Sequence, residues 1–228
     1  MCGRYEAGQK QRIAEAFHVT VHLDNIYFGA HVECAPGSLQ PVISLANGER
    51  RITEMRWGFK LPARLVFNAR SDTLTASRFW KERLHHRCII PASSMLEWKK
   101  TDTGPSPKYR LSVKGRQVLG MAGLWSPWLN PKTNQWEDTF AIIPTDPNPK
   151  MSEIHDRHAV ILQPREYEEW LSDTEREPLH LLRVLPDENL TIDPLTSSPK
   201  EKIPYQQSRD SSTLSDSSKI TINNHSES

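Results

Sequence analysis

Short apolar segments bounded by polar turns recur along most of the chain, and they constrain its fold more than any other feature. They lie at 42–45, 51–57, 88–92, 95–99, 109–113, 118–125 and 140–143. Within 109–113, apolar and polar side chains alternate, as in a strand with one buried face. Asn47-Gly48 is a strong hairpin signal between the first two segments. This series predicts an α+β, mainly β protein with a curved antiparallel, barrel-like sheet and a few peripheral helices.

Few segments have a helical pattern. Residues 9–18 place Ile13 and Phe17 four positions apart among polar residues, which predicts a short amphipathic helix. A second helix is expected from Ser71 or Asp72 to about residue 85, and shorter ones at 164–170 and 178–185. Pro91 predicts a break between two strands.

The length of 228 residues suits one domain with a tail. We expect the domain to span residues 2–186 and a serine-rich, disordered tail to span 187–228. Residues 197–228 contain ten serines and five apolar side chains, too few to offset the entropy cost of ordering the backbone.

Net charge is only +1, but positive charge is concentrated in residues 51–90, which contain nine Lys or Arg residues and only three acidic residues. Such a segment fits an anionic partner if its charges fold to one face. Trp57, Phe59 and Trp80 lie among these charges, a composition typical of single-stranded nucleic-acid grooves. The alternatives are a solvated basic helix and tryptophans that belong to the core.

The three cysteines, Cys2, Cys34 and Cys88, are far apart and form no C-x-x-C pair. The pattern indicates neither a disulfide framework nor a zinc site, and it favours a reducing compartment. We expect no metal and no cofactor. Because no signal peptide or membrane-spanning stretch is evident, we expect a cytoplasmic, nucleoid-associated protein without membrane contacts.

The chain begins Met1-Cys2-Gly3-Arg4, and loss of Met1 would leave an N-terminal cysteine. Its α-amine and thiol have ordinary pKa values of about 8 and about 8.5, so both are partly reactive near neutral pH. An aldehyde can form an imine with the amine, and the thiol can then close a five-membered thiazolidine. The alternative is that Cys2 merely follows the initiator methionine.

Three further motifs accompany this start: Asn68-Ala69-Arg70 with Arg78, Glu97-Trp98-Lys99, and His155-Asp156-Arg157. In this order and at these spacings, they resemble the SRAP family (SOS response-associated peptidases, also called abasic site processing proteins). The resemblance covers roughly residues 2–175. It implies a self-inflicted loss of Met1 and covalent capture, as a thiazolidine, of the ring-opened abasic site in single-stranded DNA. Such a protein would shield the lesion during replication and repair.

The resemblance assigns roles to residues at matching positions. Cys2 would be the nucleophile, Asn68 would hydrogen-bond near the captured sugar, Glu97 would be an acid/base group, and His155 would assist ring opening. The DNA contacts would involve Arg4, Trp57, Arg70 and Arg78. Proton transfer near neutral pH suits an imidazole or a desolvated carboxylate. The resemblance leaves open a lyase activity, any peptidase substrate beyond Met1, reversal of the crosslink, the role of the tail, and contacts with the replication machinery. We expect a monomer.

Two positions depart from the family pattern. Glu33 stands where an asparagine is usual, which puts a negative charge on the expected DNA side, and His158-Ala159 replaces a continuation with proline. Two other functions also remain open. Met-Cys-Gly also begins class II (Ntn-type) glutamine amidotransferases, and a basic segment at 51–90 alone would suit a non-catalytic single-stranded DNA binding domain.

Overall fold

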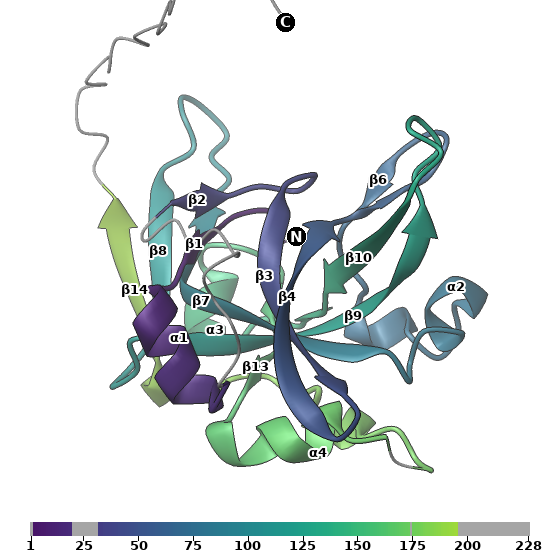
Figure 1. Ribbon diagram of the computed structural model, residues 1–228. Coiled ribbons are helices and arrows are strands. Elements are labelled where there is room, and N and C mark those ends of the chain that lie inside the picture. The colour runs from purple at the N-terminus through teal and green to yellow at the C-terminus, as the bar shows by residue number, and fades with distance from the viewer. Residues whose placement is uncertain (1, 20–31, 174, 196–228) are drawn as a thin grey trace, which may run out of the picture. The chain divides into compact units, whose positions relative to one another are not determined.

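The computed structural model describes residues 2–19, 32–173 and 175–195 (Figure 1). It is dominated by strands. The main sheet comprises β1 (Tyr5–Ala7), β2 (Glu33–Cys34), β3 (Leu39–Ala46), β4 (Glu49–Trp57), β7 (Arg87–Trp98), β8 (Lys108–Val113), β9 (Leu119–Leu129), β10 (Trp136–Ile142), β13 (Ile161–Leu162) and β14 (Leu190–Leu195). Two small ribbons pair β5 (Phe59–Lys60) with β6 (Leu65–Val66) and β11 (Pro144–Thr145) with β12 (His158–Ala159).

The sheet closes on itself. β9, β10, β4, β3 and β7 are neighbours in that order, and β7 also pairs with β9, which completes a five-stranded ring. All pairings in the ring are antiparallel except that of β10 with β4. The predicted hairpin is the β3–β4 pair, and Asn47 and Gly48 both have positive φ angles at its turn. The mainly β, barrel-like fold predicted from the sequence is therefore confirmed.

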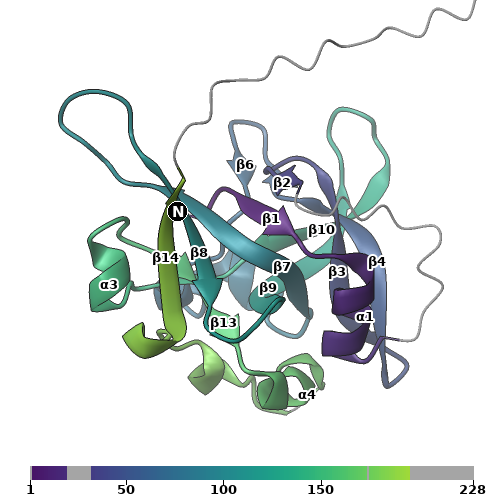
Figure 2. The ribbon, with the colours of Figure 1, turned by 90° about the vertical axis from the view of Figure 1, so that its left-hand side faces the viewer.

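The helices are short and peripheral. They are α1 (Lys10–Phe17), α2 (Arg78–Lys81), α3 (Pro149–Ser152) and α4 (Tyr167–Leu171), with 3-10 turns at Ser71–Thr73, Pro164–Glu166, Leu179–Leu181 and Asp187–Asn189. α1 lies against β3 and β4 (Figure 2). Arg50 Nη1, on β4, donates to the carbonyl of Phe17 (3.1 Å). None of the helices in the described ranges is long and apolar enough to cross a membrane.

Alternate side chains of the ring strands enter two different hydrophobic clusters. On β10, Phe140 and Ile142 belong to one cluster, while Ala141 belongs to the other. The first cluster includes Cys2 and Tyr5 from the N-terminal segment, and the second includes the apolar residues of α1 and α4. The alternation of a strand thus places the N-terminal segment and α3 on one face of the sheet and α1, α2 and α4 on the other.

Two local predictions were wrong. The single helix expected from residue 71 or 72 to about 85 is a 3-10 turn followed by α2, because Ser77 has an extended backbone (φ −83°, ψ 117°) that interrupts the helix. The break expected at Pro91 is absent: β7 runs through it, with Pro91 opposite Gly120 of β9. On its other side, Pro91 lies between the positions at which β7 pairs with β3 (Ile89) and with β1 (Ala92), so it has no ladder partner there and a residue without an amide donor is tolerated.

The folded part also extends beyond residue 186. β14 lies beside β8 (Figure 2) and pairs with it from Leu190 opposite Val113 to Leu195 opposite Lys108. Leu190 is buried. The predicted domain boundary at 186 therefore precedes both this six-residue strand and the 3-10 turn before it, which the mixed composition of the segment did not indicate. The rest of the predicted tail, 196–228, lies outside the described residues.

Candidate active site

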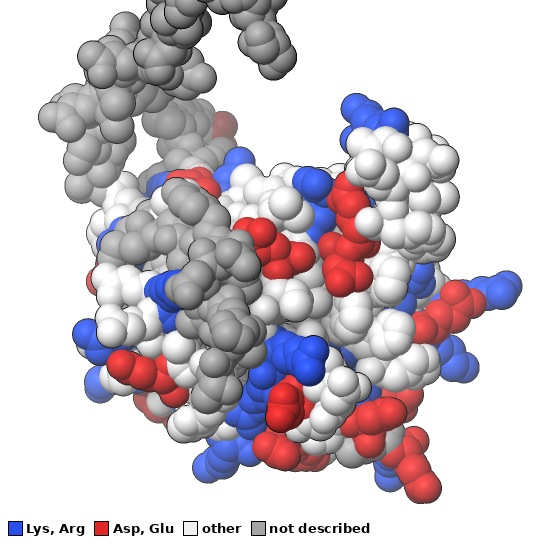
Figure 3. Space-filling model, in the orientation of Figure 1, with Lys and Arg blue, Asp and Glu red and all other residues white. Residues whose placement is uncertain are grey.

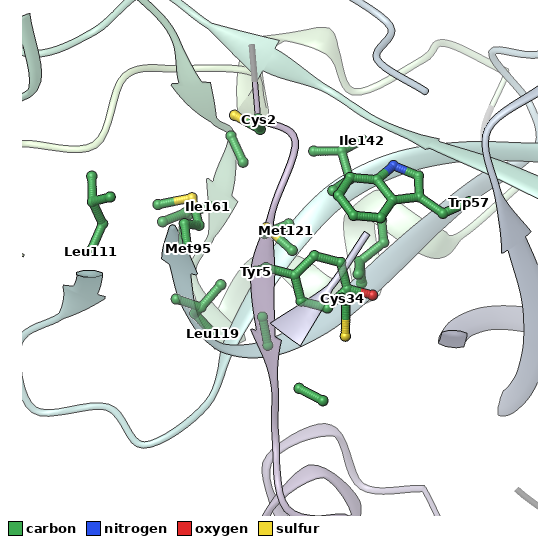
Figure 4. Close-up of a cluster of buried hydrophobic side chains, with 14 of the residues drawn as sticks. Cys2, Tyr5, Cys34, Trp57, Met95, Leu111, Leu119, Met121, Ile142 and Ile161 are labelled. Atoms are coloured by element: carbon green, nitrogen blue, oxygen red, sulfur yellow. The ribbon is translucent and has the colours of Figure 1, made fainter. Parts of the chain in front are cut away.

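Cys2 is held at the end of the first hydrophobic cluster by backbone contacts (Figure 4). β1 pairs with β7 through Tyr5 and Met95, and the next contact outward is the amide of Leu96, which donates to the carbonyl of Arg4 (3.0 Å). The N-terminal segment therefore follows β7 as far as its outer end. Cys2 itself is buried, with 2% of its surface exposed.

Asn68 contacts Cys2 from a segment that lies beside β10. Its side-chain amide Nδ2 donates to the carbonyl of Cys2 (3.2 Å). Its backbone is fixed because Asn68 bridges Ile142 of β10 and the amide of Ala69 donates to the Ile142 carbonyl (2.8 Å). The side-chain oxygen Oδ1 is buried and has no hydrogen-bond partner within the described part of the chain, so it can accept a bond from a ligand.

Glu97, near the end of β7, places a carboxyl group beside the thiol. Its side chain is buried, and this desolvation raises the pKa of Glu97 to about 8, although a hydrogen bond with Cys2 acts in the opposite direction. Burial and the neighbouring Glu97 likewise raise the pKa of the Cys2 thiol well above its ordinary value. Near neutral pH, both groups are therefore mainly protonated.

His155 lies on the other side of Glu97. Its Nε2 is 4.0 Å from Glu97 Oε2, and its Nδ1 lies 3.1 Å from the backbone amide of Arg157 and 3.0 Å from Asp156 Oδ1. Burial lowers the pKa of His155, which favours the neutral ring. Beside it opens a hollow lined by Lys99, Lys100, Pro147, Ser152, Glu153, Ile154, His155 and Asp156.

The loop that carries His155 is anchored by α3. The Asn148 side chain accepts a hydrogen bond from the amide of Met151 (2.7 Å), as an N-cap does, and donates to the carbonyl of Leu185 (2.8 Å). Arg157 forms ion pairs with Asp146 and with Asp72 (3.4 Å to the latter). The position of His155 thus depends on contacts with two distant segments.

Each arginine predicted to hold phosphate is paired with a carboxylate. Two lie at the site: Arg4 is 3.2 Å from Glu33, and Arg70 forms two hydrogen bonds with Asp72 (3.0 and 2.5 Å). Asp72 also contacts Arg157, which connects the Arg70 loop to that of His155. Arg78 projects from α2 with 93% of its side chain exposed and pairs with Glu82 (2.9 Å).

The predicted role of Trp57 as a base-stacking surface is wrong. Trp57 is fully buried, its Nε1 donates to the carbonyl of Phe67 (3.1 Å), and its ring stacks on Phe140 with centroids 6.2 Å apart. Trp80 is buried as well. Both tryptophans belong to the core, which was the alternative that the sequence left open.

The basic segment 51–90 does not form one free cationic face. Arg87 is buried, where it donates to the carbonyls of Leu84 and of Trp170 at the end of α4, and Arg56 is paired with Glu137. In the view of Figure 3, Lys and Arg side chains alternate with Asp and Glu side chains over the visible surface. Some of the positive charges of residues 51–90 are therefore buried, and others are neutralised by carboxylates.

The structure thus brings Cys2, Asn68, Glu97 and His155 together, with Arg4 and Arg70 nearby. Sequence reasoning missed Asp72 and Asp146 as partners of Arg157, because these ion pairs join residues 85 and 11 positions apart. Groups of His, Cys, Asp or Glu that could hold a metal ion are absent from the part of the chain that the structure describes.

Comparisons with known proteins agree with this arrangement. A family model described as SOS response associated peptidase (SRAP) matches residues 1–199. Abasic site processing protein YoqW of Bacillus subtilis (strain 168) is 31% identical over 221 residues, which cover 90% of this chain and 97% of that protein. Abasic site processing protein HMCES of Gallus gallus is 30% identical over 184 residues, covering 66% of this chain and 54% of that protein.

Solved structures share the fold. A crystal structure of a protein from Bacteroides thetaiotaomicron has a TM-score of 0.73 at 22% identity and covers 86% of this chain and 93% of its own. One from Bordetella bronchiseptica has a TM-score of 0.72, also at 22% identity, and covers 86% and 100%. At such identity, this likeness concerns the fold alone. The extent of the family match, together with YoqW, establishes that the chain belongs to the SOS response associated peptidase (SRAP) family.

Proposed function

We propose that this chain processes abasic sites in single-stranded DNA by forming a thiazolidine through Cys2 once Met1 has been removed. The observation that carries the proposal is the convergence of four chemically suitable side chains, from positions 2, 68, 97 and 155, on one buried point. The names of YoqW and HMCES, both abasic site processing proteins, support the same substrate.

Removal of Met1 is the first requirement. Hydrolysis of the peptide bond between Met1 and Cys2 consumes one water and frees the α-amine of Cys2. We propose that the chain performs this cleavage itself. The carbonyl of Cys2 is fixed by Asn68 and its thiol by Glu97, so the α-carbon between them is held in place, together with the amine nitrogen that it carries.

Opening of the abasic sugar then supplies the aldehyde. A base takes the proton of the anomeric hydroxyl while the bond from that carbon to the ring oxygen breaks and the ring oxygen gains a proton. His155 suits the role of base because burial lowers its pKa and keeps its ring neutral near pH 7.

Capture proceeds in two further steps. The amine adds to the aldehyde carbon, and a proton moves from nitrogen to oxygen to give a carbinolamine. Glu97 donates a proton to the hydroxyl, which leaves as water, so that an iminium forms beside the Glu97 carboxylate. The thiol of Cys2 then adds to this C=N bond: sulfur bonds to carbon, the electron pair of the C=N bond returns to nitrogen, and the thiol proton passes to Glu97, which restores its carboxyl group. Because Glu97 has a pKa of about 8, it can both donate and accept a proton near neutral pH.

The test is incubation of the purified protein with single-stranded DNA that contains one abasic site, followed by heating in denaturant and electrophoresis. We expect a shifted, heat-stable band with abasic DNA and none with intact DNA. Cys2→Ala should abolish the band, whereas Cys88→Ala, which removes another buried free thiol, should retain it.

Other functions predict other results. A glutamine amidotransferase would release ammonia from glutamine and give no band, and a non-catalytic DNA binder would give a complex that salt and denaturant dissolve. A lyase would cleave the abasic strand, which the same gel would reveal as a shortened oligonucleotide. Wild-type protein without a heat-stable band would refute the proposal, provided that its mass shows Met1 to be absent.

A further inference from the structure

The two carboxylate oxygens of Glu33 contact cations from two other parts of the chain. Arg4 Nε lies 3.2 Å from Oε1, and Lys108 Nζ contacts Oε2. The side chains of Arg4 and Glu33 are each 39% exposed and that of Lys108 is 27% exposed, so solvent reaches all three. The carboxylate thus joins β2 to β8 and to the residues that precede β1.

This ion-pair cluster, Arg4–Glu33–Lys108, lies beside the end of β7 that carries Glu97. The backbone of Arg4 is bonded to that of Leu96, the residue before Glu97. Lys108 pairs across the ladder with Trp98, the residue after Glu97, and its ammonium group is 5.0 Å from the centre of the Trp98 ring. Both cations therefore flank the β7 segment that carries the proposed acid/base group.

We propose that Glu33 determines specificity by withholding Arg4 and Lys108 from the phosphates of intact single-stranded DNA. This inference rests on the proposed function. In the resting protein, both cations are neutralised, so an undamaged strand gains little from contacting them. A strand with an abasic site is retained by the covalent bond to Cys2 instead, and selectivity for the lesion rises because background binding is weak.

The strength of the cluster fits such a role. A phosphate can pair with these cations only by displacing the Glu33 carboxylate, whose negative charge opposes its approach. Ion pairs at this level of exposure contribute little to stability, so replacement of Glu33 should free both cations without any rearrangement of the fold. Each cation that becomes free to neutralise a phosphate steepens the dependence of log K on log salt by about 0.7 for a single strand. Between 50 and 200 mM salt, that slope corresponds to a change of about 2.6-fold in affinity per cation.

The experiment measures binding of intact single-stranded DNA to wild-type protein, Glu33→Gln and Glu168→Gln by fluorescence anisotropy over a salt series. Glu168→Gln is the matched control, because it removes the same charge from another ion pair, with Arg50, on α4. We expect Glu33→Gln to bind intact DNA at least about threefold more tightly than wild type at low salt. Its plot of log K against log salt should be steeper by about 0.7 to 1.4. Glu33→Asp, which keeps the charge, should resemble wild type. Glu168→Gln should keep the wild-type slope.

A second substitution identifies the cation that is released. Lys108→Gln should hardly change the salt slope of the wild-type protein, where Glu33 already neutralises Lys108. In the Glu33→Gln background, the same change should make the slope shallower by about 0.7. Equal effects of Lys108→Gln in both backgrounds would contradict the proposal.

Selectivity is read separately, from the rate of crosslinking to abasic DNA in a large excess of intact strand. We expect this rate to fall in Glu33→Gln and to stay at the wild-type level in Glu168→Gln. If Glu33→Gln binds intact DNA no more tightly than Glu168→Gln does, or more weakly than wild type, the inference is overturned. Absence of crosslinking in every variant would refute the proposed function instead, and the binding series would still decide the role of Glu33.

Discussion

Glu97 differs from the other carboxylates near the site because burial holds its pKa at about 8. A solvated glutamate would be ionised at neutral pH and could not donate a proton. We predict that Glu97→Gln slows crosslinking by about 100-fold or more, the usual contribution of general acid catalysis. The wild-type rate should also decline as pH rises through about 8. A rate that is unchanged in Glu97→Gln would rule out this role.

The same group makes a prediction about stability. Its pKa rises from an ordinary value of 4.5 to about 8 on folding, so the folded state binds the proton more tightly. Between these values, the unfolded chain carries the charge and the folded chain does not, and stability therefore falls as pH rises. Relative to Glu97→Gln, the free energy of unfolding of the wild type should decline by up to about 1.4 kcal/mol per pH unit. Urea denaturation at pH 5, 6, 7 and 8 measures it, and parallel curves for the two proteins would contradict the prediction.

Asn68 acts on Cys2 through one hydrogen bond to its carbonyl. Loss of such a bond costs about 0.5–1.5 kcal/mol. If the bond holds Cys2 in its reactive position, Asn68→Ala should slow crosslinking by about two- to tenfold while the mass still shows removal of Met1. A variant with the wild-type crosslinking rate would show that Cys2 is positioned without Asn68.

At the scale of elements, β7 organises the site, because it pairs with β1 and β8 and carries Glu97 close to its end. The sequence predicted apolar strands on both sides of Pro91 but not their continuity. Continuity depends on partners at long range, such as Gly120 of β9, which no local pattern specifies. The prediction of one helix from residue 71 or 72 to about 85 was wrong for a related reason. Leu74, Trp80 and Leu84 are buried as the helical pattern predicts, but the backbone of Ser77 between them is extended.

Trp57 belongs to this scale as a core residue of β4. We predict that Trp57→Phe lowers stability by about 1–3 kcal/mol, because it leaves a cavity and an unpaired Phe67 carbonyl. Crosslinking per folded molecule and affinity for intact DNA should remain at wild-type levels. Denaturation curves and the anisotropy assay measure the two effects. A selective loss of DNA affinity without loss of stability would restore the stacking role.

At the scale of the molecule, β14 determines how much of the chain the folded unit needs. It pairs with β8 along its whole length, and β8 pairs with the part of β7 that holds Glu97. We predict that a chain ending at residue 196 keeps the stability and crosslinking of the full chain. A chain ending at residue 186 should unfold at a lower temperature, because β8 loses its outer partner and the cluster loses Leu190. Equal melting temperatures for the two truncations would show that β14 is dispensable.

The sequence was enough to predict the class of fold. It also predicted the four residues that meet at the site, Cys2 among them, because their separated motifs resemble those of the SRAP family. It could not reveal the burial of Glu97, since Leu96, Trp98 and Lys99 around it suit a solvated strand equally well. Nor could it reveal that Arg4 and Arg70 are paired with Glu33 and Asp72. Desolvation and ion pairing are properties of the assembled molecule, so they followed only from the structure.

The most direct test of the central claim is mass spectrometry of the product formed with an abasic oligonucleotide after proteolysis of the protein. The account predicts one adduct, on the N-terminal peptide that begins with Cys2, with the mass of the DNA aldehyde added and one water lost. It should be stable without reduction. Cys2→Ala should yield an adduct only after trapping with borohydride, because its amine can still form an imine. An adduct on any other residue, or a wild-type adduct that also requires borohydride, would contradict the account.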